Sequence, residues 1–250
     1  MIDTVTLSVF PTALEASRTL ALEVAAQIQA INQAGRHAVL GLATGSSPIL
    51  LYDELIRLHR EQSLSFAHVI TFNLDEYCGL SRADEQSYVT FMHEHLFDHV
   101  DIPAANIHLP SGTERDATAH CAAYERMIAE VGGIDFQLVG IGRIGHIGFN
   151  EPGSAIDSRT RKVELSALTR EDAAAAFGGL AHVPSSAITM GCGTILAARR
   201  IAFIAFGAHK AGIVQRALEG PVTEQVPASF LRQHGNTHYF LDEAAAAQLG

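Results

Sequence analysis

The sequence predicts an α/β fold, a doubly wound, mostly parallel sheet with helices on both faces, in a single domain that spans residues 1–250. Short apolar segments typical of buried strands alternate with longer segments of helical periodicity. No internal repeat and no Pro- or Ser-rich linker interrupts this alternation. A chain of 250 residues with 48% hydrophobic content is long enough to bury a full core.

The predicted elements follow one another along the chain. Strands are expected at 4–10, 37–43, 68–74, 135–141, 187–189, 200–206 and 236–242. Helices are expected at 12–34, 49–60, 87–99, 117–131, 194–198 and 211–218, with one more short helix at the end. Gly35 ends the first helix, and Pro48 suits the first turn of the second, where the preceding hydroxyls would cap it. Residues 101–110 are expected to form an irregular connection.

The composition argues against several classes of partner. A formal net charge of −10 makes nucleic acid an unsuitable partner, because phosphate backbones are bound by surfaces rich in lysine and arginine. Cys78, Cys121 and Cys192 form no C-x-x-C pair, which argues against disulfides and against a cysteine-based zinc site. The N-terminus has no basic leader segment, and no apolar run reaches the ~18 residues of a membrane span. We therefore expect a cytoplasmic protein without a membrane partner.

The segment DFQLVGIGRIGHIGFNEPG, residues 135–153, is the centre of the predicted site. Its first half is an apolar strand, and the loop that follows is too rich in glycine to continue that strand. The loop places His146 and Glu151 within five residues of each other. An imidazole and a carboxylate at the end of a parallel strand are suited to proton transfer.

The same loop also fits the dinucleotide fingerprint G-x-G-x-x-G through Gly140, Gly142 and Gly145. That fingerprint requires a helix to begin at the third glycine, so that its N-terminus can bind a pyrophosphate. Gly148 and Pro152 follow too soon for such a helix. We therefore expect no nicotinamide or flavin cofactor.

Three further polar turns follow predicted strands. The turn at 44–48 comprises Thr44, Gly45, Ser46, Ser47 and Pro48, and its amides at a helix start could hold a phosphate group, although an ordinary capped turn fits equally. Asp75 and Glu76 follow the strand at 68–74. Lys210 begins the helix at 211–218, a position that disfavours a cation unless an anion shares the site. Because all four turns follow parallel strands, we expect them to converge at one edge of the sheet.

Two clusters of polar residues receive a plainer interpretation. The basic cluster SRTRK, residues 158–162, is expected to be a solvated surface turn, with an anion site as the alternative. His93 and His95 are expected to lie on an amphipathic helix rather than to bind metal, and no metal site is predicted.

Seven segments, in order along nearly the whole chain, match one family. They are GLATGSSP (41–48), TFNLDEYCGL (71–80), SYVTFMHEHLFDHVDIPAANIHL (87–109), GIGRIGHIGFNEPGS (140–154), SRTR (158–161), ITMGCGTIL (188–196) and FGAHKA (206–211). Through them the chain resembles the glucosamine-6-phosphate deaminases, also called glucosamine-6-phosphate isomerases. The related 6-phosphogluconolactonases share the histidine, but their pattern then resembles S-L-F-P-G, where this chain has FNEPG (149–153).

The resemblance implies a reaction and a role for each site residue. An amino-sugar phosphate, glucosamine 6-phosphate, would become fructose 6-phosphate and ammonia without a cofactor. Asp75 would carry the proton from C2 to C1, His146 would open the sugar ring, and Glu151 would support His146. The phosphate of the substrate would be held by Thr44, Gly45, Ser46, Ser47 and Lys210.

The chain departs from the family pattern at two positions. In many members an acidic or amide residue stands directly before the glycine of G-H-I and pairs with the histidine, whereas this chain has Ile144 there. Isoleucine accepts no hydrogen bond, so the tautomer of the imidazole would have to be fixed by Glu151, a backbone carbonyl or water. The resemblance also implies a phosphate-binding arginine a few residues after L-T-R. This chain has an alanine at that position, which we assign to Ala175. Arg170 or Arg161 are the expected substitutes.

Other functions remain compatible with the sequence. A deaminase for galactosamine 6-phosphate or another sugar phosphate, a 6-phosphogluconolactonase-like hydrolase and a non-catalytic sugar-phosphate sensor are the alternatives. Asp75 and Glu151 favour an enzyme over a sensor. The sequence also leaves a homo-oligomer open.

Overall fold

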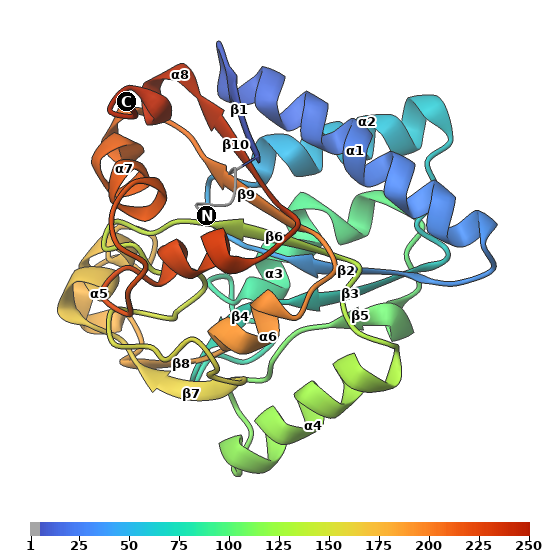
Figure 1. Ribbon diagram of the computed structural model, residues 1–250. Helices are drawn as coiled ribbons and strands as arrows, with labels where there is room; N and C mark the ends of the chain where they lie inside the picture. Colours follow the sequence, from blue (N-terminus) through green and yellow to red (C-terminus); the bar gives the residue numbers. More distant parts are fainter. Residues whose placement is uncertain (1–5) are drawn as a thin grey trace.

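The computed structural model describes residues 6–250, which contain a large parallel sheet and a small antiparallel sheet (Figure 1). In spatial order the large sheet consists of β1 (Thr6–Phe10), β10 (Thr237–Asp242), β9 (Ile201–Ala205), β6 (Phe136–Gly140), β2 (Ala38–Leu42), β3 (Val69–Asn73) and β5 (Ile107–His108). The small sheet consists of β4 (Asp75–Tyr77), β8 (Ser186–Thr189) and β7 (Arg161–Glu164).

Helices connect the strands and cover the large sheet. They are α1 (Ala13–Gln33), α2 (Ile49–Gln62), α3 (Tyr88–His95), α4 (Ala117–Glu130), α5 (Ala167–Ala173), α6 (Cys192–Leu196), α7 (Ala211–Leu218) and α8 (Glu243–Ala246). In the view of Figure 1, α1 and α2 lie above the large sheet and α4 lies below it. The predicted doubly wound, mostly parallel fold is therefore confirmed.

The strand order fixes where a ligand site can form. From β2 the chain proceeds outward through β3 to β5, and from β6 it proceeds in the other direction through β9 to β10. The order therefore reverses between β2 and β6, which pair in parallel through Leu40 with Phe136 and Gly41 with Gln137. In open α/β sheets a crevice opens at this reversal, outside the carboxyl ends of the strands.

The core lies against the central strands. β2 and β9 are buried at every position, and β3, β6 and β10 are buried at all but one position each. Such continuous burial is typical of parallel strands covered on both faces, and it explains their apolar sequences. Close packing also requires a glycine within β2, because a Cβ atom on Gly41 would lie 2.1 Å from Oε1 of Gln137.

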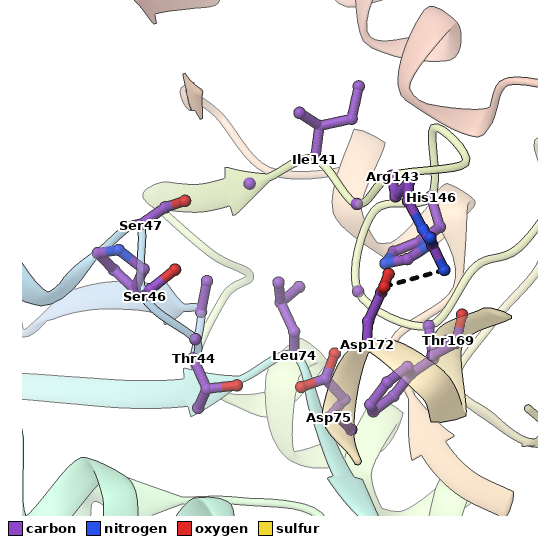
Figure 2. Close-up of a pocket in the computed structure, with 18 of the residues that line it drawn as sticks. Thr44, Ser46, Ser47, Leu74, Asp75, Ile141, Arg143, His146, Thr169 and Asp172 are labelled. Carbon is purple, nitrogen blue, oxygen red and sulfur yellow. Dashed lines mark ion pairs between the residues drawn. The ribbon is translucent and has the colours of Figure 1, made fainter. Parts of the chain in front are cut away.

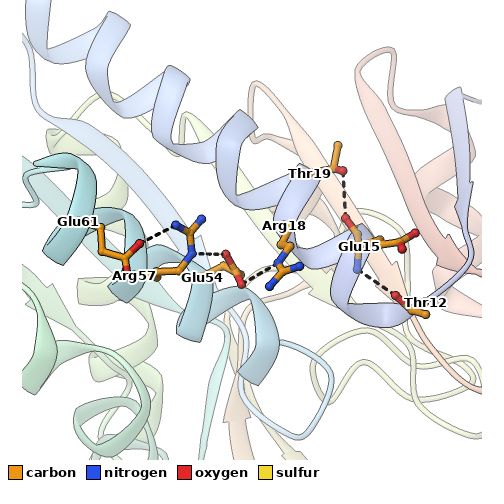
Figure 3. Close-up of polar contacts among 7 residues, drawn as sticks. All are labelled: Thr12, Glu15, Arg18, Thr19, Glu54, Arg57 and Glu61. Atoms are coloured by element: carbon orange, nitrogen blue, oxygen red, sulfur yellow. Dashed lines mark hydrogen bonds and ion pairs between the residues drawn. The ribbon is translucent and has the colours of Figure 1, made fainter.

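A buried carboxylate joins α1 to α2 (Figure 3). Glu54 on α2 is 6% exposed and accepts hydrogen bonds from Nε of Arg18 on α1, at 3.0 Å, and from Nε of Arg57, at 2.8 Å. Burial opposes ionisation of this carboxylate, but the bonds from Arg57 and Arg18 outweigh it and lower the pKa of Glu54. The bonds from Arg18 and Arg57 to Glu54 thereby hold α2, the helix that begins after the turn 44–48, against α1.

Several local predictions need correction. The connection at 101–110 contains the short strand β5, and the last two residues of the basic cluster at 158–162 are the first two of β7, so the cluster is not a turn throughout. α2 begins after Pro48 without a side-chain cap, so the preceding hydroxyls do not cap it. Residues 4 and 5 of the first predicted strand lie outside the described residues. The longest helix, α1, has 21 residues, and neither it nor another helix within residues 6–250 is suited to spanning a membrane.

Candidate active site

One cavity of about 300 Å³ opens at the reversal of strand order, and residues of all four predicted polar turns line it. Figure 2 labels lining residues from three of these turns, among them Ser46, Asp75 and His146. Its wall is formed by the turn after β2, the start of β4, the loop after β6, helix α5 and the turn after β9. The lining residues are Ala43, Thr44, Gly45, Ser46, Ser47, Pro48, Leu74, Asp75, Tyr77, Tyr88, Gly140, Ile141, Gly142, Arg143, His146, Gly148, Phe149, Thr169, Asp172, Ala173 and Lys210. Of the residues given a catalytic or phosphate-binding role through the family resemblance, every one except Glu151 is in this wall.

The turn at 44–48 presents free backbone donors to the cavity. Gly45 adopts a φ of 91°, in the left-handed region that favours glycine. Within residues 6–250, the amides of Gly45, Ser46 and Ser47 have no hydrogen-bond acceptor. They precede α2, a helix of 14 residues whose dipole places partial positive charge at this end. The turn therefore has the donors and the field that a phosphate group requires.

Lys210 lines the same cavity and follows β9, on the other side of the reversal from β2. Its ammonium donates to the carbonyl oxygen of Ile141 at 2.7 Å, which anchors the side chain at the cavity wall. Burial lowers the pKa of Lys210, and the carboxylate of Asp172 opposes that shift. An ammonium has three N–H donors, so two remain for a ligand after the bond to Ile141.

The adjacent carboxylates of β4 have different surroundings. Asp75 is 5% exposed and lines the cavity, next to an aromatic group in which the Tyr77 ring lies 5.2 Å from Phe149 and 5.1 Å from Tyr88. Glu76 accepts hydrogen bonds from the amides of Tyr77 at 2.8 Å, Tyr88 at 3.1 Å and Val89 at 3.2 Å. Glu76 thus accepts hydrogen bonds from the backbone amides at the start of α3. Of the two adjacent carboxylates, only Asp75 lines the cavity.

Burial and the neighbouring Glu76 raise the pKa of Asp75 to about 8. A carboxyl group with a pKa in this range exchanges protons readily near neutral pH, which is the requirement for an acid or base in catalysis. The backbone makes room for it, since Gly148 has a φ of 55° and a Cβ there would lie 3.2 Å from Oδ2 of Asp75. The loop after β6 therefore approaches Asp75 directly.

His146 lies in the same cavity as Asp75. Its ring packs on Gly142, where a Cβ atom would lie 1.8 Å from Nε2, so only glycine is compatible with this ring position. The Nδ1 atom is buried and has no hydrogen-bond partner within residues 6–250. Burial lowers the pKa of His146, against the opposing charge of Glu151. The imidazole is therefore neutral near pH 7, with one nitrogen free to accept a proton.

Glu151 lies outside the wall of the cavity and bonds the loop after β6 to another element. Both of its carboxylate oxygens accept from the amide of Ser166, at 3.2 and 3.1 Å, and Oε1 also accepts from the Ser166 hydroxyl at 3.1 Å. Ser166 is the N-cap of α5. The structure gives Glu151 no hydrogen bond to His146, so it acts on the imidazole only through its charge and joins the loop to α5.

Sequence reasoning missed Arg143 and Asp172, which form an ion pair in the cavity wall next to His146 (Figure 2). Nη2 of Arg143 lies 3.0 Å from Oδ1 of Asp172 and 3.8 Å from Oε2 of Glu171. Asp172 belongs to α5, whereas Arg143 belongs to the loop after β6. The only sequence signal for the pair is a cation within the glycine-rich loop.

The expected substitutes for a phosphate arginine lie elsewhere. Arg170 donates to the carbonyls of Leu180 and Val183, and Arg161 donates to the side chains of Asn150 and Ser154. Neither arginine lines the cavity. From α5 the alanine that faces the cavity is Ala173, whereas Ala175 is absent from its wall.

The histidine pair at 93 and 95 and the basic cluster at 158–162 contact other residues of the chain. His93 and His95 lie on α3 as predicted, and Nδ1 of His93 lies 2.7 Å from Asp98. Within residues 6–250, no group of three histidine, cysteine or acidic side chains is arranged to hold a metal ion. In the basic cluster, Arg159 and Thr160 are bonded to Glu125.

Comparison with known proteins identifies the family. Residues 11–239 match the family model of glucosamine-6-phosphate isomerases/6-phosphogluconolactonase. The chain belongs to this enzyme family. It is 50% identical to a glucosamine-6-phosphate deaminase of Cellvibrio japonicus over 212 residues, an aligned region that covers 85% of this chain and 81% of that protein. It is 48% identical to glucosamine-6-phosphate deaminase 2 of Bacillus subtilis, over 87% of this chain and 88% of that protein.

Solved structures of the family share the fold. A monomeric glucosamine-6-phosphate deaminase superimposes with a TM-score of 0.94 at 41% identity, covering 97% of this chain and 99% of that one. A 6-phosphogluconolactonase from Trypanosoma brucei has a TM-score of 0.80 at 23% identity, covering 99% of each chain. At that identity the lactonase is a guide to the fold alone. The family resemblance read from the seven sequence segments is thus confirmed.

Proposed function

We propose that this member of the family is a glucosamine-6-phosphate deaminase, which converts glucosamine 6-phosphate and water into fructose 6-phosphate and ammonia. The observation that carries the proposal is that Asp75 and His146 line the same cavity as the turn at 44–48 and Lys210. A sugar phosphate bound there has its phosphate near the amides and the ammonium. Its reacting carbons then face a base and an imidazole.

The phosphate end provides binding energy and orientation. The free amides of Gly45, Ser46 and Ser47 would donate to the phosphate oxygens, and Lys210 would add a positive charge. These contacts exist in both the ground state and the transition state. They therefore position the sugar without lowering the barrier by themselves.

Ring opening is the first chemical step. The pyranose opens when a proton leaves the anomeric hydroxyl and another reaches the ring oxygen. Neutral His146 can accept the first proton and return one to the ring oxygen, because its pKa lies below its ordinary value and its ring lines the cavity. Glu151 would stabilise the imidazolium formed on the way through its negative charge.

Isomerisation and deamination follow. Ionised Asp75 would remove the proton from C2 while the aldehyde oxygen at C1 takes up a proton, giving an enolamine. Asp75 would then deliver its proton to C1 as the amine nitrogen gives one up, leaving an imine at C2. The resulting imine at C2 adds water and releases ammonia, leaving the ketone of fructose 6-phosphate. Two electrons move from C2 to C1 within the sugar, so the reaction balances without an external oxidant or reductant.

The test is an ammonia-release assay on a panel of phosphorylated sugars. We expect ammonia and fructose 6-phosphate in equal amounts from glucosamine 6-phosphate. Galactosamine 6-phosphate and 6-phosphogluconolactone provide the comparison. No ammonia from either hexosamine phosphate, or hydrolysis of the lactone alone, would overturn the proposal.

A further inference from the structure

A phosphorylated sugar would bring negative charge into a cavity whose wall already contains two carboxylates. A phosphate monoester carries between one and two negative charges near pH 7. The protein as a whole has a formal net charge of −10, and the wall of the cavity contains Asp75 and Asp172. The lysine and arginine side chains in that wall are Lys210 and Arg143. Lys210 already donates one of its N–H groups to Ile141.

Helix α5 provides no cation to the cavity. Its residues in the wall are Thr169, Asp172 and Ala173. Arg170 on the same helix is engaged by the carbonyls of Leu180 and Val183. Arg143, on the opposite loop, is therefore the one arginine of the wall.

Arg143 has unused donors. Its contacts within residues 6–250 all involve Nη2, with the carbonyl of Leu168 at 3.3 Å and with Asp172 and Glu171. A guanidinium has five N–H donors arranged as a planar fork, which suits two oxygens of one phosphate. The side chain is 53% exposed, so it is free to turn toward a ligand.

The ion pair that holds Arg143 is easily broken. The side chain of Asp172 is 44% exposed, and pairs between two exposed partners contribute little stability. The carboxylate of Asp172 also acts on Lys210, whose pKa it raises against the larger effect of burial. Asp172 thus acts on both cations of the wall, through an ion pair with Arg143 and through its charge on Lys210.

From these contacts we propose that Arg143 is the second phosphate-binding cation of the cavity, and that Asp172 holds it there until the phosphate of the substrate takes its place. The inference rests on the proposed function in one respect, that the cavity binds a phosphorylated sugar. It adds a residue and an exchange of partners that the sequence motifs do not indicate.

Calorimetric titration with inorganic phosphate tests the exchange without requiring turnover. Arg143→Gln removes the charge and keeps a polar side chain, and we expect it to weaken phosphate binding on the order of 10-fold. Asp172→Asn removes the competing carboxylate and should tighten the same binding. Arg126→Gln, on the exposed surface of α4, is the matched control and should bind phosphate as the wild type does.

Steady-state kinetics provide the second readout. Arg143→Gln should raise KM for glucosamine 6-phosphate on the order of 10-fold while kcat changes much less, because phosphate contacts are equal in the ground and transition states. Arg143→Lys keeps a positive charge but replaces the planar fork of donors with one point charge. Its KM should therefore lie between those of the wild type and Arg143→Gln. Phosphate affinity in Arg143→Gln equal to that of the wild type would overturn the inference. Arginine-dependent phosphate binding without deamination would keep it and refute the proposed function.

Discussion

Asp75 and Glu76 are adjacent carboxylates that β4 directs to opposite sides. Asp75 lines the cavity, and Glu76 accepts hydrogen bonds from the amides of Tyr88 and Val89 at the start of α3. Successive side chains of a strand point to opposite faces, so the two acids cannot share one role. Glu76 holds α3 in place, while its charge helps to raise the pKa of its neighbour.

The pH dependence of kcat/KM should report Asp75. The base must be ionised to remove a proton from C2, and burial raises its pKa from 3.8 to about 8. We therefore expect kcat/KM for glucosamine 6-phosphate to rise with pH and to reach half its limit near the higher value. A carbon NMR titration of the ligand-free protein should give the same midpoint. A profile governed by an ordinary aspartate, flat across the neutral range, would contradict this assignment.

Lys210→Ala should act mainly on binding. The ammonium lies in the wall of the cavity that the turn at 44–48 also lines, where its charge would assist a phosphate in the ground and transition states alike. We expect KM to rise by about 10- to 100-fold, with a smaller fall in kcat. Lys162→Ala provides the control, since Lys162 is the other lysine of the chain and is exposed on β7. A loss confined to kcat would assign Lys210 to chemistry instead of binding.

Glu151→Gln should separate charge from structure. The amide retains an acceptor for Ser166 but removes the charge that raises the pKa of His146, so that pKa should fall in an NMR titration. Ser166→Ala is the complementary variant: it removes the hydroxyl cap and should loosen α5, which amide hydrogen exchange detects. An unchanged His146 titration in Glu151→Gln would exclude the electrostatic role.

Glu54→Gln should destabilise the protein by about 1–2 kcal/mol at neutral pH, because two charge-assisted bonds between α1 and α2 are lost. The pKa of Glu54 is lowered from 4.5 in the folded state, so its contribution is present above that pH and disappears as the pH falls through the folded-state value. Denaturant unfolding at neutral and acidic pH measures the difference. A destabilisation that persists at acidic pH would instead indicate a packing defect.

The sequence was sufficient for the large sheet, apart from its short edge strand β5, and for most of the cavity. Apolar segments such as 37–43 and 200–206 correspond to β2 and β9, because parallel strands buried on both faces require continuous apolar sequence. The polar turns that follow them converge because the carboxyl ends of parallel strands share one edge. That argument brought Lys210 and Asp75 together from residues far apart in the chain.

The remaining features depend on contacts that no local pattern encodes. β4 has three residues, and β7 has the sequence RKVE, so neither shows the apolar run of a buried strand. The partner of Glu151 is Ser166 rather than His146, and it lies across a loop and the small sheet. Arg143 and Asp172 are joined only when α5 packs on the loop after β6. Long-range pairs of this kind require the tertiary structure.

The turnover of Asp75→Asn tests the central claim most directly. The asparagine keeps the shape of the side chain but cannot accept the proton from C2, so kcat for glucosamine 6-phosphate should fall by about 10²- to 10⁴-fold. Binding of inorganic phosphate, measured on the same preparation, should be nearly unchanged. Turnover comparable to that of the wild type, with phosphate binding intact, would contradict the assignment of Asp75 as the base.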